Sequence, residues 1–102
     1  MMASSILRVR RRTGAGAGSS RPFDIVLDGT VIGALNKGEH LEEPLEAGSH
    51  SLQVRAGRFV SPELAFDIDA SETVSYACRG RLVLPLYTSQ RAPVAGIDLR
   101  SE

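Results

Sequence analysis

The sequence predicts an all-β protein, a compact antiparallel β-sandwich of about seven or eight short strands. Apolar and polar residues alternate with a period of two along much of the chain, as they do in half-buried strands. Gly, Asp, Asn and Ser interrupt this alternation about every eight to twelve positions, the spacing typical of sandwiches and barrels. No stretch places its apolar residues at the 3.6-residue spacing of a helix.

The first predicted strand covers residues 5–10. Leu7 and Val9 fall on one side of it, and Arg8 and Arg10 on the other. Residues 13–20 follow and consist of Gly, Ala, Ser and one Thr. Because such side chains offer little to pack, this segment is expected to be a flexible loop.

A hairpin is predicted around Asp28-Gly29, which lies between the apolar runs of residues 23–27 and 30–35. Asp-Gly favours a two-residue type I′ turn, because both positions need positive φ. The expected register pairs Leu27 with Thr30, Val26 with Val31, Ile25 with Ile32 and Phe23 with Ala34. One face then holds Phe23, Ile25, Leu27, Ile32 and Ala34.

Four further segments are predicted before the C-terminal region. Residues 40–46 alternate poorly and contain Pro44, which favours a short edge strand or a bulged segment. Residues 50–56, 63–69 and 73–79 alternate clearly and predict half-buried strands. Their expected inward side chains are Leu52, Val54, Leu64, Phe66, Ile68, Val74, Tyr76 and Cys78.

The end of the chain is harder to assign. Residues 81–87 are more continuously apolar after Arg81, and Pro85 favours an edge strand or a strand end. Residues 82–87 are therefore the expected exposed apolar edge. Residues 89–102 are expected to form a loose tail, with a last short strand over residues 94–99 as the alternative. The predicted organisation is one domain over residues 1–88 followed by this tail.

The composition restricts the class of protein. The chain has 102 residues and one cysteine, and no apolar run approaches the length that spans a bilayer. We expect a cytoplasmic protein without a transmembrane segment. Residues 1–22 hold five arginines and no acid, whereas residues 23–102 hold seven bases and twelve acids. This polarity favours attraction of an anionic partner, of the acidic body of the chain itself, or of a second copy.

Metal sites have weak support. His40 and His50, with Glu39 or Glu42, offer three ligands, but zinc ligands normally come in closer pairs. Asp67, Asp69 and Glu72 offer oxygen ligands but lack the glycine and the distal glutamate of an EF-hand loop. We interpret the histidines as polar residues at strand starts and the acids as a solvated strand end.

Catalysis also has weak support, and we expect neither a catalytic residue nor a cofactor. Cys78 shares the inward side with Val74 and Tyr76, which indicates a small core residue and not a reactive thiolate. No serine lies in a Gly-x-Ser-x-Gly elbow. The glycines of residues 14–18 lack the Gly-Lys-Ser/Thr ending of a phosphate-binding loop.

The best candidate site is the arginine cluster Arg8, Arg10, Arg11 and Arg12, which has no acid within it. Guanidinium groups bind phosphates through paired hydrogen bonds. On an extended strand Arg8, Arg10 and Arg12 project to one side. They are an anion-binding edge, a guard against edge-to-edge pairing, or partners for Glu42, Glu43 and Glu46. No aromatic residue alternates with them to stack on bases.

Two segments resemble the PEGA-like β-sandwich domains of bacterial proteins and small bacterial proteins of the same plan. The first is IVLDGTVIG, residues 25–33, which is similar to the family's strand, Asp-Gly turn and following glycine. The second is LEAGSHSLQV, residues 45–54, which is similar to its Leu-x-x-Gly-x-His-x-Leu-x-Val segment. The resemblance covers roughly half the chain, from Phe23 to about Cys78, and implies a non-enzymatic accessory or binding module with no catalytic residue to carry over.

The function predicted from these observations is a non-catalytic protein-interaction module that binds another protein, or a second copy of itself, through strand edges or loops. The alternative is an anion or nucleic-acid binder that uses Arg8, Arg10, Arg11 and Arg12.

Overall fold

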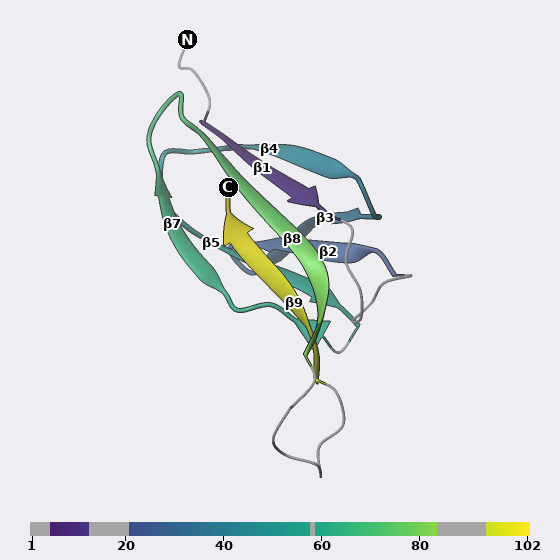
Figure 1. The fold of residues 1–102 in the computed structure, drawn as a ribbon. Helices are drawn as coiled ribbons and strands as arrows, with labels where there is room; N and C mark the ends of the chain where they lie inside the picture. Colours follow the sequence, from purple (N-terminus) through teal and green to yellow (C-terminus); the bar gives the residue numbers. More distant parts are fainter. Residues whose placement is uncertain (1–4, 13–20, 58, 84–93) are drawn as a thin grey trace.

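The protein is a sandwich of two packed β-sheets in a computed structural model, which describes residues 5–12, 21–57, 59–83 and 94–102 (Figure 1). None of these described residues forms a helix long and apolar enough to cross a membrane. The predicted all-β sandwich is confirmed. Nine strands are formed: β1 (Ser5–Arg11), β2 (Phe23–Leu27), β3 (Thr30–Leu35), β4 (His40–Leu45), β5 (Gly48–Ala56), β6 (Phe59–Val60), β7 (Leu64–Ile68), β8 (Thr73–Val83) and β9 (Val94–Ser101).

The strands are divided between a four-stranded sheet A, in the order β4-β1-β8-β9, and a sheet B, in the order β3-β2-β5-β6 with β7 also paired to β5. Six of the seven described strand pairings are antiparallel, and the pairing of β1 with β8 is parallel. The chain passes through sheet B between β1 and β8, and this long connection lets β8 run in the same direction as β1. The predicted edge strand over residues 40–46 is β4, at the edge of sheet A.

The core lies between the two sheets and follows the predicted alternation. Each of β1 and β5 contributes two side chains with no solvent exposure, and Cys78 of β8 is only 1% exposed. The fully enclosed apolar side chains are Leu7, Val9, Phe23, Ile25, Leu52 and Val54. Removing such side chains from water is the main favourable term in folding a domain of this size.

The hairpin of β2 and β3 begins as predicted and then departs from the prediction. Asp28 and Gly29 have φ values of 51° and 81°, and Leu27 pairs with Thr30. The predicted pairings of Ile25 with Ile32 and of Phe23 with Ala34 are wrong, because a β-bulge shifts the register and pairs Phe23 with Leu35. The extra residue places the larger Leu35 in the core and leaves Ala34 exposed, which buries more apolar surface.

The C-terminal region differs most from the prediction. Residues 94–101 are not a loose tail, since β9 pairs with β8 over eight residue pairs, so the alternative of a last strand is the correct one. Leu82 and Val83 lie within β8 and pair with β9, so they are not at a sheet edge. The rest of the predicted edge, residues 84–87, the loop of residues 13–20 and residues 89–93 lie outside the described residues.

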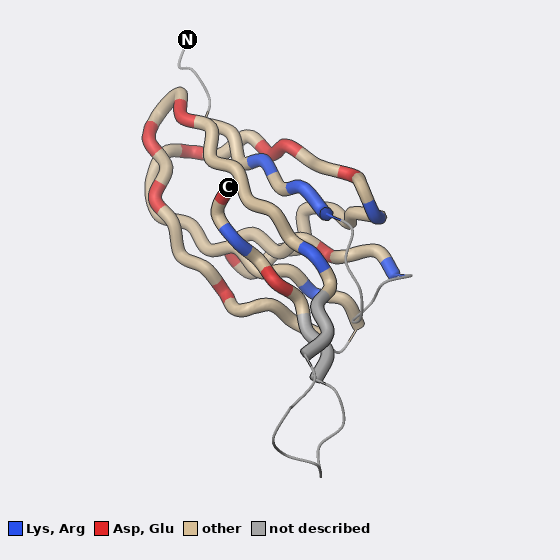
Figure 2. Tube along the Cα trace, viewed as in Figure 1, with Lys and Arg blue, Asp and Glu red and all other residues tan. Residues whose placement is uncertain are grey.

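Basic residues gather on three neighbouring strands, with acids among them. Figure 2 shows basic residues on β1, β8 and β9, and acidic residues on β9, along β4 and β7 and in the turn between β7 and β8. The strands that carry the basic residues are neighbours in sheet A. The outer face of this sheet is therefore the place where positive charge is concentrated.

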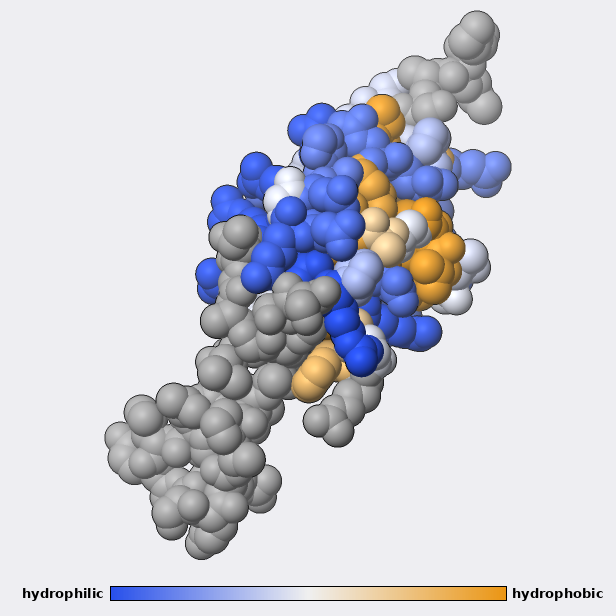
Figure 3. Space-filling model, turned by 90° about the vertical axis from the view of Figure 1, so that its right-hand side faces the viewer, coloured by the Kyte–Doolittle hydropathy of each residue, from blue (hydrophilic) through white to orange (hydrophobic). Residues whose placement is uncertain are grey.

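A smaller apolar patch lies where the edges of β3 and β4 meet. Val31 of β3 is 53% exposed, and Ile32 and Leu41 are partly buried beside the core. Figure 3 shows this patch surrounded by hydrophilic atoms. The two strands approach closely here, because a methyl group added to Gly33 would lie 3.1 Å from a methyl carbon of Leu41.

Candidate functional site

Five arginines with described side chains line the outer face of sheet A, and we call this surface the arginine face. In β1, Leu7 and Val9 point into the core, so Arg8 and Arg10 point outward. The same alternation turns Arg79 of β8 outward between the buried strand positions. The arginine face comprises Arg8, Arg10, Arg12, Arg79 and Arg100, together with the carboxylates Glu42, Asp98 and Glu102.

The strand register sets the order of these side chains across the sheet. Arg10 of β1 is aligned with Ala77 of β8, and Ala77 is aligned with Arg100 of β9. Arg12 follows the end of β1, and its N–H donates to the carbonyl of Cys78 at 2.8 Å. This bond extends the alignment by one more step, so that Arg12 and Arg79 lie next to each other on neighbouring strands.

Part of the positive charge is already neutralised within the protein. Arg8 pairs with Glu42 at 2.6 Å, and Arg10 pairs with Glu102. The Asp98 carboxylate lies 3.1 Å from Arg100 Nε and 3.8 Å from Arg79 Nε. Among the side chains that the structure describes on this face, five guanidinium groups stand against three carboxylates, an excess of two positive charges. The predicted pairing of the cluster with the acids of residues 42–46 is confirmed for Arg8 and Glu42.

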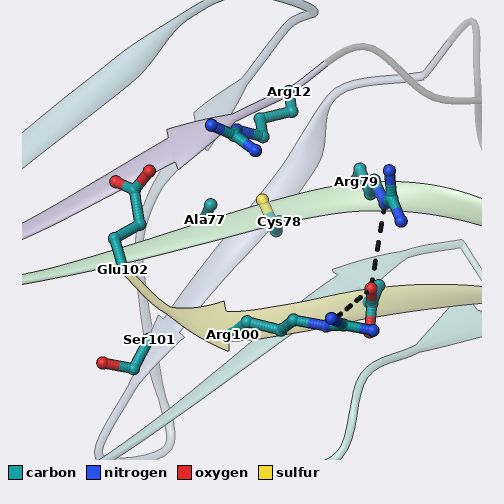
Figure 4. Close-up of a pocket in the computed structure, with 8 residues that line it drawn as sticks. Arg12, Ala77, Cys78, Arg79, Arg100, Ser101 and Glu102 are labelled. Atoms are coloured by element: carbon teal, nitrogen blue, oxygen red, sulfur yellow. Dashed lines mark ion pairs between the residues drawn. The ribbon is translucent and has the colours of Figure 1, made fainter.

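A shallow hollow of about 280 Å³ lies at the centre of the arginine face, over the short side chain of Ala77 (Figure 4). The long side chains of Arg12, Arg79 and Arg100 border it, and Arg12 makes no ion pair with any described residue. The other lining residues are Cys78, Asp98, Ser101 and Glu102. Guanidinium groups that border a hollow from three strands can donate several charge-assisted hydrogen bonds to one carboxylate or phosphate.

Arg11 belongs to the predicted arginine cluster but does not lie on this surface. Its side chain is only 2% exposed and points between the sheets, where Nη1 donates to the carbonyls of Arg21 at 2.7 Å and Leu35 at 2.9 Å. Burial lowers the pKa of its guanidinium, although not enough to discharge it at neutral pH. The reason is the alternation of β1, which places residue 11 on the same side as Leu7 and Val9.

The two histidines do not form a common site. His40 lies on β4 of sheet A, and His50 lies on β5 of sheet B. His50 Nδ1 is 2.6 Å from Asp28 Oδ2, and its Nε2 is 2.8 Å from the carbonyl of Glu46. The hydrogen bond from His50 lowers the pKa of Asp28, and the same bond raises the pKa of His50. These contacts make a structural cluster beside the Asp28-Gly29 turn.

The acids near residue 70 are also engaged locally. Asp67 accepts a hydrogen bond from the Ser49 hydroxyl at 2.5 Å, and Glu72 Oε1 accepts one from the Asp69 N–H at 2.8 Å. Within the described residues, no three His, Cys, Asp or Glu side chains gather as metal ligands. The carboxylates of this region therefore organise a turn between β7 and β8.

Cys78 lies in the core, as the sequence predicts, with its side chain 1% exposed. Burial raises the pKa of its thiol to about 12, and the positive charge of Arg11 opposes this only in part. The thiol is therefore protonated and enclosed at neutral pH. The glycines of residues 14–18 lie outside the described residues.

Sequence reasoning missed Arg79 and Arg100 as members of the candidate site. The alternation of residues 73–79 places Arg79 on the outward side and so contains part of the signal. Nothing in the sequence indicates that β8 lies between β1 and β9, and only this pairing brings Arg79 and Arg100 next to the N-terminal arginines.

Comparison of the chain with protein-family models, with curated proteins and with solved structures found no match. The resemblance to PEGA-like domains therefore stays a prediction. The candidate site rests on its own geometry: an arginine-bordered hollow on the outer face of a four-stranded sheet.

Proposed function

We propose that this protein is a non-catalytic interaction module that binds an acidic segment of a partner protein on the arginine face. The observation that carries the proposal is the convergence of Arg12, Arg79 and Arg100, from the end of β1, from β8 and from β9, around one hollow. Three donors of fixed charge and fork-shaped geometry suit a carboxylate that reaches the hollow from an extended partner.

Exposure supports this role for the three arginines. The side chains of Arg79 and Arg100 are 54% and 72% exposed, and each keeps most of its donors available while it contacts Asp98. Arg12 is exposed and forms no ion pair with a described residue. A carboxylate placed over Ala77 therefore gains partners without first breaking a buried ion pair.

An acidic protein segment fits this face better than a nucleic acid does. The described part of the arginine face has no Phe, Tyr or Trp on which a base can stack. Three carboxylates lie among the arginines, and they repel a continuous row of phosphates more than a segment with spaced carboxylates. The whole chain has a formal charge of zero, so long-range attraction of a polyanion is weak.

The interaction is expected to be modest in affinity. Exposed ion pairs contribute about 0.2–1 kcal/mol each, so a few of them give weak binding that depends on ionic strength. Binding is expected to weaken as salt rises, because each contact releases bound counterions.

The test measures fluorescence anisotropy of a fluorescein-labelled ten-residue peptide of alternating Glu and Ser, whose carboxylates are spaced, at about 20 mM and about 200 mM NaCl. The variant R12A/R79A removes two positive charges that border the hollow, and the matched control K37A/R55A removes two exposed positive charges elsewhere. We expect binding to weaken about fivefold or more in R12A/R79A and less than about twofold in the control.

Three outcomes contradict the proposal. The first is the absence of peptide binding to the unmodified protein at low salt. The second is an equal loss of affinity in R12A/R79A and K37A/R55A, which would indicate general charge attraction. The third is tighter binding of a single-stranded oligonucleotide with the same charge, which would favour a nucleic acid as the natural ligand. Circular dichroism of each variant checks that it is folded.

A further inference from the structure

β9 ends sheet A, and among the described strands only β8 pairs with it, so no described strand continues the ladder on its other edge. The N–H of Glu102 donates to the carbonyl of Ser75 at 2.9 Å, which fixes the hydrogen-bonding alternation along β9. Asp98, Arg100 and Glu102 direct their backbone groups toward β8, so Ile97, Leu99 and Ser101 direct theirs away from the sheet.

The other edges of the sandwich are less suited to pairing. β4 contains Pro44, which has no N–H, and carries the acids Glu42 and Glu43. The β-bulge in β3 interrupts its ladder. The exposed apolar patch in Figure 3 lies on that bulged side of the molecule. β7 is five residues long and has Asp67 as its only charge, so two copies of β7 cannot form a pair of opposite charges between them.

The sequence of β9 is complementary to itself. When two copies of β9 run antiparallel with Leu99 facing Leu99 of the second copy, Asp98 faces Arg100 of the second copy and Arg100 faces its Asp98. Ile97 then faces Ser101. In this register Ile97, Leu99 and Ser101, whose backbone groups point away from β8, lie opposite each other as hydrogen-bonded pairs of the two copies. An antiparallel arrangement with two-fold symmetry requires such pairs.

We propose that two copies of this chain associate through β9 in this register and form a symmetric dimer. The two four-stranded sheets A become one continuous sheet, and the two arginine faces become one surface. The register centred on Leu99 satisfies both the charges and the ladder.

The dimer does not depend on which ligand binds the arginine face, although it changes how that ligand is held. A partner with two acidic segments would contact both hollows of the dimer and gain avidity without any new contact type. The dimer itself needs only the edge of β9 and the alternating charges of Asp98 and Arg100.

Sedimentation equilibrium over about 5 µM to about 500 µM tests the dimer, because weak interfaces dissociate in this range. In a dimer of either variant, Asp98→Arg or Arg100→Asp, residues 98 and 100 of the two copies carry like charges and face each other across the interface. Each variant is expected to weaken dimerisation about tenfold. A mixture of the two variants restores opposite charges at both positions and is expected to form a heterodimer. Arg55→Asp, on β5 of sheet B, makes the same charge change away from β9 and is expected to leave dimerisation unchanged.

A second variant removes a backbone donor without changing any charge. Ser101→Pro removes an N–H that faces away from β8, so it blocks the intermolecular ladder and leaves the intramolecular ladder intact. We expect a monomer in sedimentation equilibrium, and because Ser101 also lines the hollow, peptide binding is measured on the unmodified protein so that failure of the dimer and failure of the proposed function stay distinguishable. A monomeric unmodified protein over the whole range would overturn the dimer, and so would dimers that persist in Ser101→Pro or fail to reappear in the mixture.

Discussion

The guanidinium carbon of Arg11 lies 3.6 Å from the centroid of the Phe23 ring, and this contact joins the two sheets at one end of the sandwich. Arg11 belongs to β1 of sheet A, and Phe23 belongs to β2 of sheet B. The same guanidinium donates to the carbonyl of Leu35, the last residue of β3. Carbonyl oxygens and an aromatic face thus hold this buried cation between the two sheets.

Replacing Arg11 is therefore expected to destabilise the fold. Arg11→Ala removes two charge-assisted hydrogen bonds and the contact with Phe23, and the free energy of unfolding is expected to fall by about 2–4 kcal/mol. Arg12→Ala is the matched control, since Arg12 is exposed, and a change below about 0.5 kcal/mol is expected. Urea unfolding followed by circular dichroism measures both. Equal stability of the two variants would show that Arg11 does not hold the sheets together.

The side of β1 on which each residue lies could have been predicted from the sequence. Leu7 and Val9 define the inward side, and the same period places Arg11 with them and Arg8 with Arg10 on the outside. This alternation predicts Arg8, Arg10 and Arg12 on one side of the strand, although the shared charge of all four arginines groups them as one candidate site. Local alternation thus contains enough information to separate the structural arginine from the surface arginines.

Pairing between distant strands could not be predicted in the same way. The register of β2 and β3 was correct beside the turn, where Leu27 pairs with Thr30, and failed beyond the bulge, where Leu35 replaces Ala34 opposite the core. The position of a bulge depends on how well the whole core packs, and the sequence of one hairpin does not contain that information. The parallel pairing of β1 with β8, which assembles the arginine face, depends on tertiary packing for the same reason.

The turn between β2 and β3 is expected to be sensitive to substitution of Gly29. Gly29 has a φ of 81°, a conformation that L-residues with a side chain rarely adopt, and an added methyl group would meet no atom within 4 Å. Gly29→Ala is thus expected to lower the free energy of unfolding by about 1 kcal/mol through backbone strain alone. Gly29→Asn is expected to lose less, because Asn tolerates this region. Thermal or urea unfolding distinguishes them, and a larger loss for Asn than for Ala would contradict the argument.

The thiol of Cys78 is predicted to be unreactive in the folded protein. Its pKa of about 12 leaves roughly one thiol in ten thousand ionised at pH 8, and the side chain is almost fully buried. Labelling with Ellman's reagent is expected to be slow in buffer and complete within minutes in about 6 M urea. Fast stoichiometric labelling under native conditions would show that β8 opens easily or that the thiol is accessible.

The cluster of His50 and Asp28 is expected to make stability depend on pH. Both ring nitrogens of His50 lie at acceptors, Asp28 Oδ2 and the carbonyl of Glu46, so the doubly protonated imidazolium satisfies both contacts. The Asp28 carboxylate also accepts from the N–H of Ser51 at 2.8 Å and so fixes the turn to β5. The raised pKa of His50 and the lowered pKa of Asp28 both mean that the charged pair is favoured in the folded state.

The signs of the two shifts define the pH range of this stabilisation. For His50, whose folded pKa is raised, the contribution is fully present below its unfolded pKa of about 6.5 and is lost as pH rises through the folded value. For Asp28, whose folded pKa is lowered, the contribution is present above its unfolded pKa of about 3.9 and is lost as pH falls through the folded value. The pair therefore stabilises the fold most between about pH 4 and pH 6.5.

A double-mutant cycle with Asp28→Asn and His50→Gln measures this contribution. Asn is a suitable replacement because it also favours the positive φ of 51° found at residue 28, so the turn itself is preserved. The Asp28 side chain is 48% exposed, and solvent screening limits the expected coupling energy to about 0.5–1 kcal/mol near pH 5.5. The coupling is expected to decline toward zero by about pH 9, because a neutral imidazole has only one N–H to donate. Urea unfolding from about pH 4 to about pH 9 gives the profile. A coupling energy that is constant over this range, or that increases with pH, would show that the contact does not depend on protonated His50.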